Sequence, residues 1–127
     1  MSIKQEELAT YYAQKYPLTF AKDVIKHNDS LSNRFQEAWD LAEKAALVLK
    51  EQFAAKKVVV FGSLIKRPLF TFWSDVDLAV WGITDDKFYA AVGVVTRINS
   101  DFKVDLIDAQ ACRDSLCKTI ESEGIEV

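Results

Sequence analysis

Two aspartates interrupt an apolar segment at alternate positions, and this pattern constrains the fold more than any other feature. The segment DVDLAVW, residues 75–81, is rich in the β-branched and apolar residues that are typical of a strand. Side chains two residues apart on a strand point to the same side. Asp75 and Asp77 therefore share one face of the predicted strand, and the apolar residues that follow each of them form the buried face.

A second segment of the same kind, FKVDLI, covers residues 102–107. Its apolar residues alternate and predict another strand with one buried face. Lys103 and Asp105 then point to the opposite side. If the two strands are neighbours, Asp105 reaches the same place as Asp75 and Asp77.

The first third of the chain is predicted to be helical. Residues 3–16 suit a short helix that ends before Pro17, since the residue before a proline avoids the α region. Residues 17–31 are predicted to add only a helical turn or two. A long helix is expected from Ser32 or Asn33, because the apolar residues that follow recur at spacings of three and four. This part shows no chemistry, so we expect core packing and contacts between copies of the chain from it.

After the long helix, the pattern changes to short strands and shorter helices. Residues 58–61 form a β-branched run bounded by a glycine, which predicts a buried strand. Thr84 is a good N-cap for a helix that reaches about Asn99, and a last helix is expected over residues 109–122. The order α-α-β-β-α-β-α predicts an α/β (α+β) domain with a small mixed sheet flanked by helices. The β-α-β unit would make its two strands parallel.

The composition is that of one folded domain. Half of the 127 residues are apolar and 28% are charged, which suits a single core. We assign residues 1–56 to N-terminal helices and residues 57–127 to the core of the domain, which contains the strands and the candidate site. The formal net charge of −3 offers no global basic field for strong non-specific nucleic-acid binding.

The sequence also predicts where the protein is located and in which redox state its cysteines are. No apolar run approaches the ~20 residues of a membrane helix, and the N-terminal segment lacks the apolar region of a signal peptide. A cytoplasmic protein without a membrane contact is therefore expected. Cys112 and Cys117 are expected to be reduced thiols within the last helix.

Three aspartates gathered at one place repel one another. Two unit charges ~4 Å apart repel by about 4 kcal/mol at an effective dielectric constant of ~20. A protein can hold such a cluster if one acid is protonated or if a cation neutralises it. Oxygen ligands alone select a hard ion, Mg²⁺ or Mn²⁺, and phosphoryl and nucleotidyl transfer use such sites. The alternative is that Asp75 merely opens a strand and Asp77 is solvated at an edge.

A glycine and a serine end the preceding strand, where phosphates would have to lie. Gly62 lets the backbone approach closely, and Ser63 offers a hydroxyl and a backbone N–H as donors. Lys66 and Arg67 follow and offer positive charge. Each of these features alone is more typical of an ordinary turn or a solvated loop.

Together, these features resemble the DNA polymerase beta-type nucleotidyltransferase superfamily. The shared pattern is Gly62-Ser63, eleven residues, an Asp-Val-Asp-Leu strand, and a Val-Asp-Leu strand later in the chain. The resemblance runs from about Val58 to Val127, and the small size points to the minimal nucleotidyltransferases. Lys66 stands where that branch usually has arginine, and the loop RPLFTFW after the serine is bulkier than usual.

The resemblance implies a nucleotidyltransferase fold and roles for six residues. Metal ions, Mg²⁺ or Mn²⁺, would be bound by Asp75, Asp77 and Asp105. The nucleotide phosphates would be held by Gly62, Ser63 and Lys66. Asp105 would also help to deprotonate the acceptor hydroxyl.

The resemblance also implies a reaction and a partner. The implied reaction is transfer of a nucleoside monophosphate, AMP from ATP, to a hydroxyl group. Many minimal nucleotidyltransferases act as antitoxins beside a HEPN-type RNase toxin, and some transfer AMP to a tyrosine of that toxin. A HEPN-type toxin is thus the implied partner.

Other classes of protein fit the sequence less well. Sugar-nucleotide glycosyltransferases use a D-x-D motif but need a far longer chain. Haloacid-dehalogenase-type phosphatases follow the motif with a small residue and threonine, where this chain has Leu78-Ala79-Val80. The main alternative is a catalytically weak module of the same fold that binds nucleotide or partner. Lys66 and the aromatic loop with Phe70, Phe72 and Trp73 favour that module, whereas the three acids favour activity.

Overall fold

Apolar residues at spacings of three and four fold into one continuous helix, α2, which runs from Leu18 to Phe53. The structure, a computed structural model, describes residues 18–127, with side chains described from Ser30 onward. The predicted start at Ser32 or Asn33 is wrong, because no proline or glycine occurs in residues 18–53 to end a helix there. The helix predicted over residues 3–16 lies outside the described residues.

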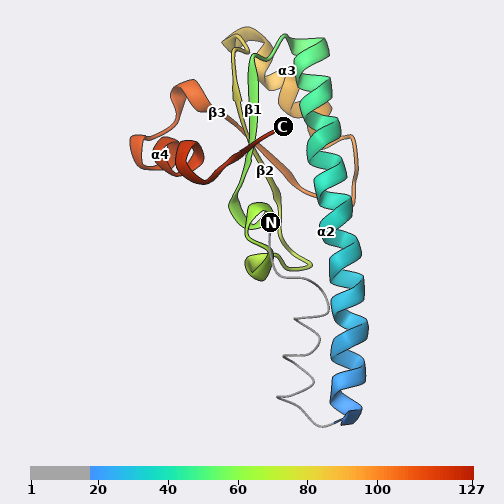
Figure 1. Cartoon of the computed structure of the whole chain (residues 1–127). Coiled ribbons are helices and arrows are strands. Elements are labelled where there is room, and N and C mark those ends of the chain that lie inside the picture. Colours follow the sequence, from blue (N-terminus) through green and yellow to red (C-terminus); the bar gives the residue numbers. More distant parts are fainter. Residues whose placement is uncertain (1–17) are drawn as a thin grey trace.

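Helix α2 lies alongside a four-stranded mixed sheet (Figure 1). The strands are β1 (Lys57–Phe61), β2 (Val76–Trp81), β3 (Val104–Asp108) and β4 (Ile125–Glu126). They are arranged in the order β3-β2-β1-β4. β1 pairs antiparallel with β2 and with β4, and β2 pairs parallel with β3. The predicted mixed sheet and the predicted parallel pair are confirmed.

Two longer helices and three short 3₁₀ helices complete the described chain. The longer ones are α3 (Asp85–Thr96), which connects β2 with β3, and α4 (Asp114–Glu123). The 3₁₀ helices are η1 (Gly62–Ile65), η2 (Arg67–Leu69) and η3 (Ala109–Ala111). The last helix therefore begins later than the predicted residue 109, after a short turn. None of the helices in the described part of the chain is long and apolar enough to cross a membrane.

The sheet separates two apolar clusters of unequal size. The larger one packs against α2 and α3 and includes Val58, Val60, Val76, Leu78, Val104 and Leu106. The smaller one lies on the opposite face and consists of Val59, Ala79, Ala109 and Ile120. Figure 1 shows α4 on one side of the sheet and α2 on the other. This division follows the alternation along each strand that the sequence predicts.

Strand β4 was not predicted, because two residues are too short for any periodic pattern. It pairs with β1 through Val59–Glu126 and Val60–Ile125. The chain enters it through Gly124, where an added Cβ would overlap the Val59 side chain and the Ile120 carbonyl oxygen. Glycine is therefore required for the close turn from α4 onto the sheet edge.

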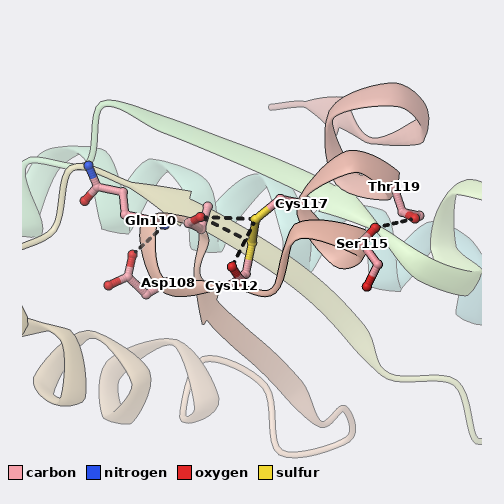
Figure 2. The surroundings of a disulfide bond; sticks show 7 residues. Asp108, Gln110, Cys112, Ser115, Cys117 and Thr119 are labelled. Atoms are coloured by element: carbon pink, nitrogen blue, oxygen red, sulfur yellow. Dashed lines mark hydrogen bonds between the residues drawn. A yellow bond between two sulfur atoms is a disulfide. The ribbon is translucent and has the colours of Figure 1, made fainter.

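The two cysteines form a disulfide, and the prediction of two reduced thiols is wrong (Figure 2). Cys112 lies in the turn before α4 and not within a helix, so its side chain does not diverge from that of Cys117. Their Cα atoms are 6.0 Å apart, within the range of ordinary disulfides. The carbonyl oxygen of Ala109 lies 3.3 Å from Cys112 Sγ. The disulfide thus links the end of β3 and η3 to the first turns of α4.

A buried hydrogen bond ties α2 to the segment that follows β1. Trp39 is 9% exposed, and its indole N–H donates to the carbonyl oxygen of Leu64 at 3.2 Å. Leu64 lies in η1 and is fully buried. Because η1 begins at Gly62, this bond fixes the glycine-serine segment against the long helix.

We expect Trp39→Phe to lower the free energy of unfolding by about 1–3 kcal/mol. The buried Leu64 carbonyl would lose its donor, and the smaller ring would leave part of the space empty. Urea denaturation measures the change. Trp73→Phe is the matched control, because Trp73 is 87% exposed and should change stability by less than about 0.5 kcal/mol. Equal stability of Trp39→Phe and the wild type would show that the bond does not hold the segment.

Candidate active site

The register of the parallel strands brings the three predicted acids together. Asp77 of β2 lies opposite Asp105 of β3, and Asp75 directly precedes β2. One carboxylate oxygen from each residue lies within 4.8 Å of the other two. We call Asp75, Asp77 and Asp105 the acid cluster. The cluster lies on the sheet face opposite α2, beside the first residue after β1.

That first residue, Gly62, makes room for the central acid. Its φ angle is +77°, a conformation that favours glycine. A Cβ at this position would overlap Asp77 Oδ2. Glycine is thus required here for two reasons. The backbone conformation favours it, and the absence of a side chain leaves space for the carboxylate of Asp77.

The acids differ in their surroundings. The side chains of Asp75 and Asp105 are 34% and 48% exposed. Burial raises the pKa of Asp77 to about 6, with further increases from the charges of Asp105 and Asp75 and a smaller opposing effect of Lys103. Burial is thus the main reason why the ionised form of Asp77 is unfavourable, and the two neighbouring carboxylates add to it.

In the part of the chain whose side chains are described, Lys103 alone forms ion pairs with the acid cluster. Lys103 Nζ lies 3.9 Å from Asp75 Oδ2 and 3.8 Å from Asp105 Oδ1. The alternation along the strand predicts that Lys103 lies on the side of Asp105, but no role in the site was predicted for it. The signal in the sequence that could have indicated such a role is the position of Lys103 two residues before Asp105.

The two basic residues after the glycine-serine pair lie in different surroundings. Lys66 Nζ forms an ion pair with Glu123 Oε2 at 3.1 Å, and its side chain is 46% exposed. Arg67 is only 6% exposed and donates to Ser32 Oγ at 3.0 Å. The expectation that Arg67 offers charge to phosphates is therefore wrong, because its guanidinium is buried between this loop and α2. The pairing of Lys66 with Glu123 was not predicted.

The aromatic residues of the loop before β2 also differ in their burial. Phe70 is buried and packs edge-to-face against Phe35 of α2, with ring centroids 5.2 Å apart. Trp73 is 87% exposed and Leu69 is 62% exposed. Phe70 is therefore part of the packing between this loop and α2, whereas Trp73 is open to solvent. Trp73 lies two residues before Asp75, so the exposed part of the loop flanks the acid cluster.

The donor set of the acid cluster fits a hard divalent cation. It consists of carboxylate oxygens alone, a chemistry that selects Mg²⁺ or Mn²⁺ over zinc. The close grouping and the raised pKa of Asp77 are what a site short of positive charge would show. The arrangement can therefore hold a cation and, through it, a phosphate-bearing molecule.

We expect Asp77→Asn to stabilise the metal-free protein above pH 6. Asp77 has a higher pKa in the folded protein, about 6, than its ordinary value of 3.8, so its ionised form opposes folding. That penalty is fully present above the folded pKa and disappears as the pH falls from about 6 towards 4. The gain should be about 1–2 kcal/mol at pH 7.5, because solvent screens a partly exposed group, and should shrink at pH 5.

Thermal unfolding in EDTA at the two pH values measures this gain. Asp101→Asn, which removes an exposed carboxylate outside the cluster, is the control and should change little at either pH. If Asp77→Asn unfolds at a lower temperature than the wild type at pH 7.5, Asp77 is a structural hydrogen-bonding group and carries no crowding penalty.

A comparison with protein families gives one match. The model of the family described as polymerase beta, nucleotidyltransferase, matches residues 43–127. This range is about two thirds of the 127-residue chain, and it begins earlier than the resemblance seen from Val58. A comparison with curated proteins finds none that matches. The matched range includes all four strands of the described residues and all three acids of the cluster, and the chain therefore belongs to the polymerase beta-type nucleotidyltransferases.

Proposed function

We propose that the protein is a metal-dependent nucleotidyltransferase that transfers AMP from ATP to a hydroxyl acceptor. Family membership indicates nucleotidyl transfer in general. The observation that carries the proposal is the acid cluster, in which three carboxylate oxygens from adjacent strands lie within 4.8 Å of one another. The nucleotide and the acceptor are parts of the proposal that rest on the resemblance to the minimal nucleotidyltransferases.

The acid cluster would hold Mg²⁺ or Mn²⁺. When bound, such an ion supplies positive charge that draws the triphosphate to the site and stabilises charge that develops on it. Asp77 would be the most buried of the three ligands, since Gly62 leaves space for its carboxylate. Ser63, with its backbone N–H and hydroxyl, and Lys66 would bind the phosphates on the side of η1.

In the proposed reaction, the acceptor oxygen attacks the α-phosphorus of the nucleotide. A new P–O bond forms, the bond to the bridging oxygen of the β-phosphate breaks, and pyrophosphate leaves. Asp105 would take the proton of the acceptor hydroxyl. Its side chain is 48% exposed, so an acceptor can approach it from solvent, whereas Asp77 lies deeper.

A protein is the acceptor that the exposed loop supports best. Trp73 and Leu69 are large apolar side chains exposed on the loop that leads to Asp75, and exposed apolar patches commonly mark protein contacts. A tyrosine of a HEPN-type toxin is the acceptor that the resemblance suggests. A binding-only antitoxin is the second candidate, favoured by the ion pair with Glu123 that already neutralises Lys66.

Incubation with α-labelled ATP and a co-expressed HEPN-type toxin tests the proposal. We expect label on the toxin with Mg²⁺, none in EDTA and none with Asp77→Asn, because a carboxylate ligand is lost. Calorimetry with a non-hydrolysable ATP analogue should show binding only with Mg²⁺, since a triphosphate of about −4 charge is repelled by three free carboxylates.

The two readouts separate the candidates. Mg²⁺-dependent nucleotide binding without transfer of label favours the binding-only antitoxin. Nucleotide binding of equal affinity in Mg²⁺ and in EDTA would contradict the metal site itself. A Lys87→Gln protein, changed on α3 outside the cluster, controls for the effect of a changed surface charge.

We expect Lys66→Ala to weaken binding of the ATP analogue by about 1.5–3 kcal/mol, as for the loss of a hydrogen bond to a charged group. Stability without ligand should change by less than about 1 kcal/mol, because the pair with Glu123 is half exposed. Calorimetry and urea denaturation measure the two effects. Unchanged affinity would show that Lys66 serves only its ion pair.

A further inference from the structure

Lys103 stands between the two outer carboxylates of the acid cluster. Its ammonium nitrogen lies 3.9 Å from Asp75 Oδ2 and 3.8 Å from Asp105 Oδ1. Both distances exceed that of a hydrogen bond, so the ammonium is shared by the two carboxylates and is not firmly bonded to either. Among residues 30–127, these are the only ion pairs that the cluster makes.

The backbone of Lys103 is held by a hydrogen bond to β2, whereas its ammonium lies at the surface. The carbonyl oxygen of Lys103 accepts from the Val76 N–H at 2.9 Å, which sets the residue at the start of the β2–β3 pairing. Its side chain is 70% exposed. The ammonium can therefore leave the carboxylates without loss of core packing, and its stem keeps it close to the cluster.

A divalent cation held by the cluster would compete with this ammonium. Both would use the carboxylates of Asp75 and Asp105, and like charges at such distances repel. Lys103 must then give up the position between the two acids. The phosphates of a nucleotide bound at the cluster, with a charge of about −4, would be the nearest anions for the displaced ammonium.

We propose that Lys103 is an exchangeable counter-ion of the acid cluster. It neutralises the carboxylates in the metal-free protein, gives way to the divalent ion, and then pairs with the phosphates of the bound nucleotide. This inference rests on the proposed function, because it needs the cluster to hold both metal and nucleotide. It adds a phosphate-binding residue that lies on β3's side of the site, away from Ser63 and Lys66.

This exchange predicts a result that a residue binding only the phosphates would not give. Removal of the Lys103 charge should strengthen binding of the metal alone, because a competitor is lost. The same change should weaken binding of nucleotide to the metal-loaded protein, because a phosphate partner is lost. The two effects of one substitution therefore have opposite signs.

Lys103→Gln tests this with Mn²⁺, whose free concentration is read from its electron paramagnetic resonance signal. Without nucleotide, we expect the dissociation constant for Mn²⁺ to fall by about 3- to 10-fold, a range set by solvent screening of an exposed charge. With saturating Mn²⁺, the dissociation constant of a non-hydrolysable ATP analogue should rise by about 3- to 10-fold.

Two variants serve as controls. Lys103→Arg keeps the charge, so it should show neither the gain in Mn²⁺ affinity nor the loss in nucleotide affinity. Lys87→Gln removes the same charge from α3, which follows the end of β2 that is distant from Asp75, and should change neither constant. An equal effect of Lys87→Gln and Lys103→Gln would mean a general charge effect and would overturn the proposal.

The remaining outcomes separate this inference from the proposed function. Weaker Mn²⁺ binding by Lys103→Gln would make Lys103 a support of the site and overturn the proposal. Unchanged nucleotide binding would overturn the exchange onto phosphates. If the wild type binds Mn²⁺ and nucleotide and Lys103→Gln changes neither, only this inference fails. If the wild type binds no Mn²⁺, the metal site of the proposed function fails with it.

Discussion

The parallel pairing of β2 with β3 is the constraint on which the candidate site depends. Leu78 lies opposite Leu106 in the same register that sets Asp77 opposite Asp105. A slip of one residue would turn the acids into the core and the leucines out of it. Burial of each large apolar side chain contributes about 1.5–3 kcal/mol, and five such residues of the two strands are under 10% exposed. The apolar face can therefore hold the carboxylates together against a repulsion of a few kcal/mol.

The three acids differ in their burial and in the charges that lie near them. Asp75 and Asp105 are partly exposed and share the ammonium of Lys103. Asp77 is set deeper, against the bare backbone of Gly62, and its pKa is raised. The glycine of the Gly-Ser motif thus shapes the acid cluster, besides any part that it takes in phosphate binding. The motif and the acids form one unit because Phe61 of β1 pairs with Asp77 of β2.

Strands β1, β2 and β3 and the shared face of the acids could be predicted from the sequence, because short apolar or alternating segments next to turn residues are typical of strands. Features that depend on tertiary contacts could not be predicted from the sequence. Helix α2 extends back to Leu18 because residues 18–31 contain no proline or glycine, and the capping pattern near Ser32 does not start a helix. The cysteine spacing does not reveal that Cys112 lies in a turn. The pairing of Lys66 with Glu123 requires that α4 return to the loop after β1.

The segment between β1 and β2 is anchored in its first part and exposed in its second. Leu64, Arg67 and Phe70 are each held against α2, by a hydrogen bond to Trp39, a hydrogen bond to Ser32 and a ring contact with Phe35. The turn after Phe70 is stabilised within itself, since the Thr71 N–H donates to Ser74 Oγ at 2.8 Å. It presents Trp73 to solvent.

The two parts of this segment can therefore change independently. Substitutions in the anchored part would disturb the helix contacts that position Gly62 and Ser63, and hence the acid cluster. Substitutions at the exposed turn would leave those contacts intact and alter only what approaches Asp75 and Asp105 from solvent. In the proposed reaction, phosphate binding thus depends on the core, whereas the choice of acceptor depends on a surface that the core does not constrain.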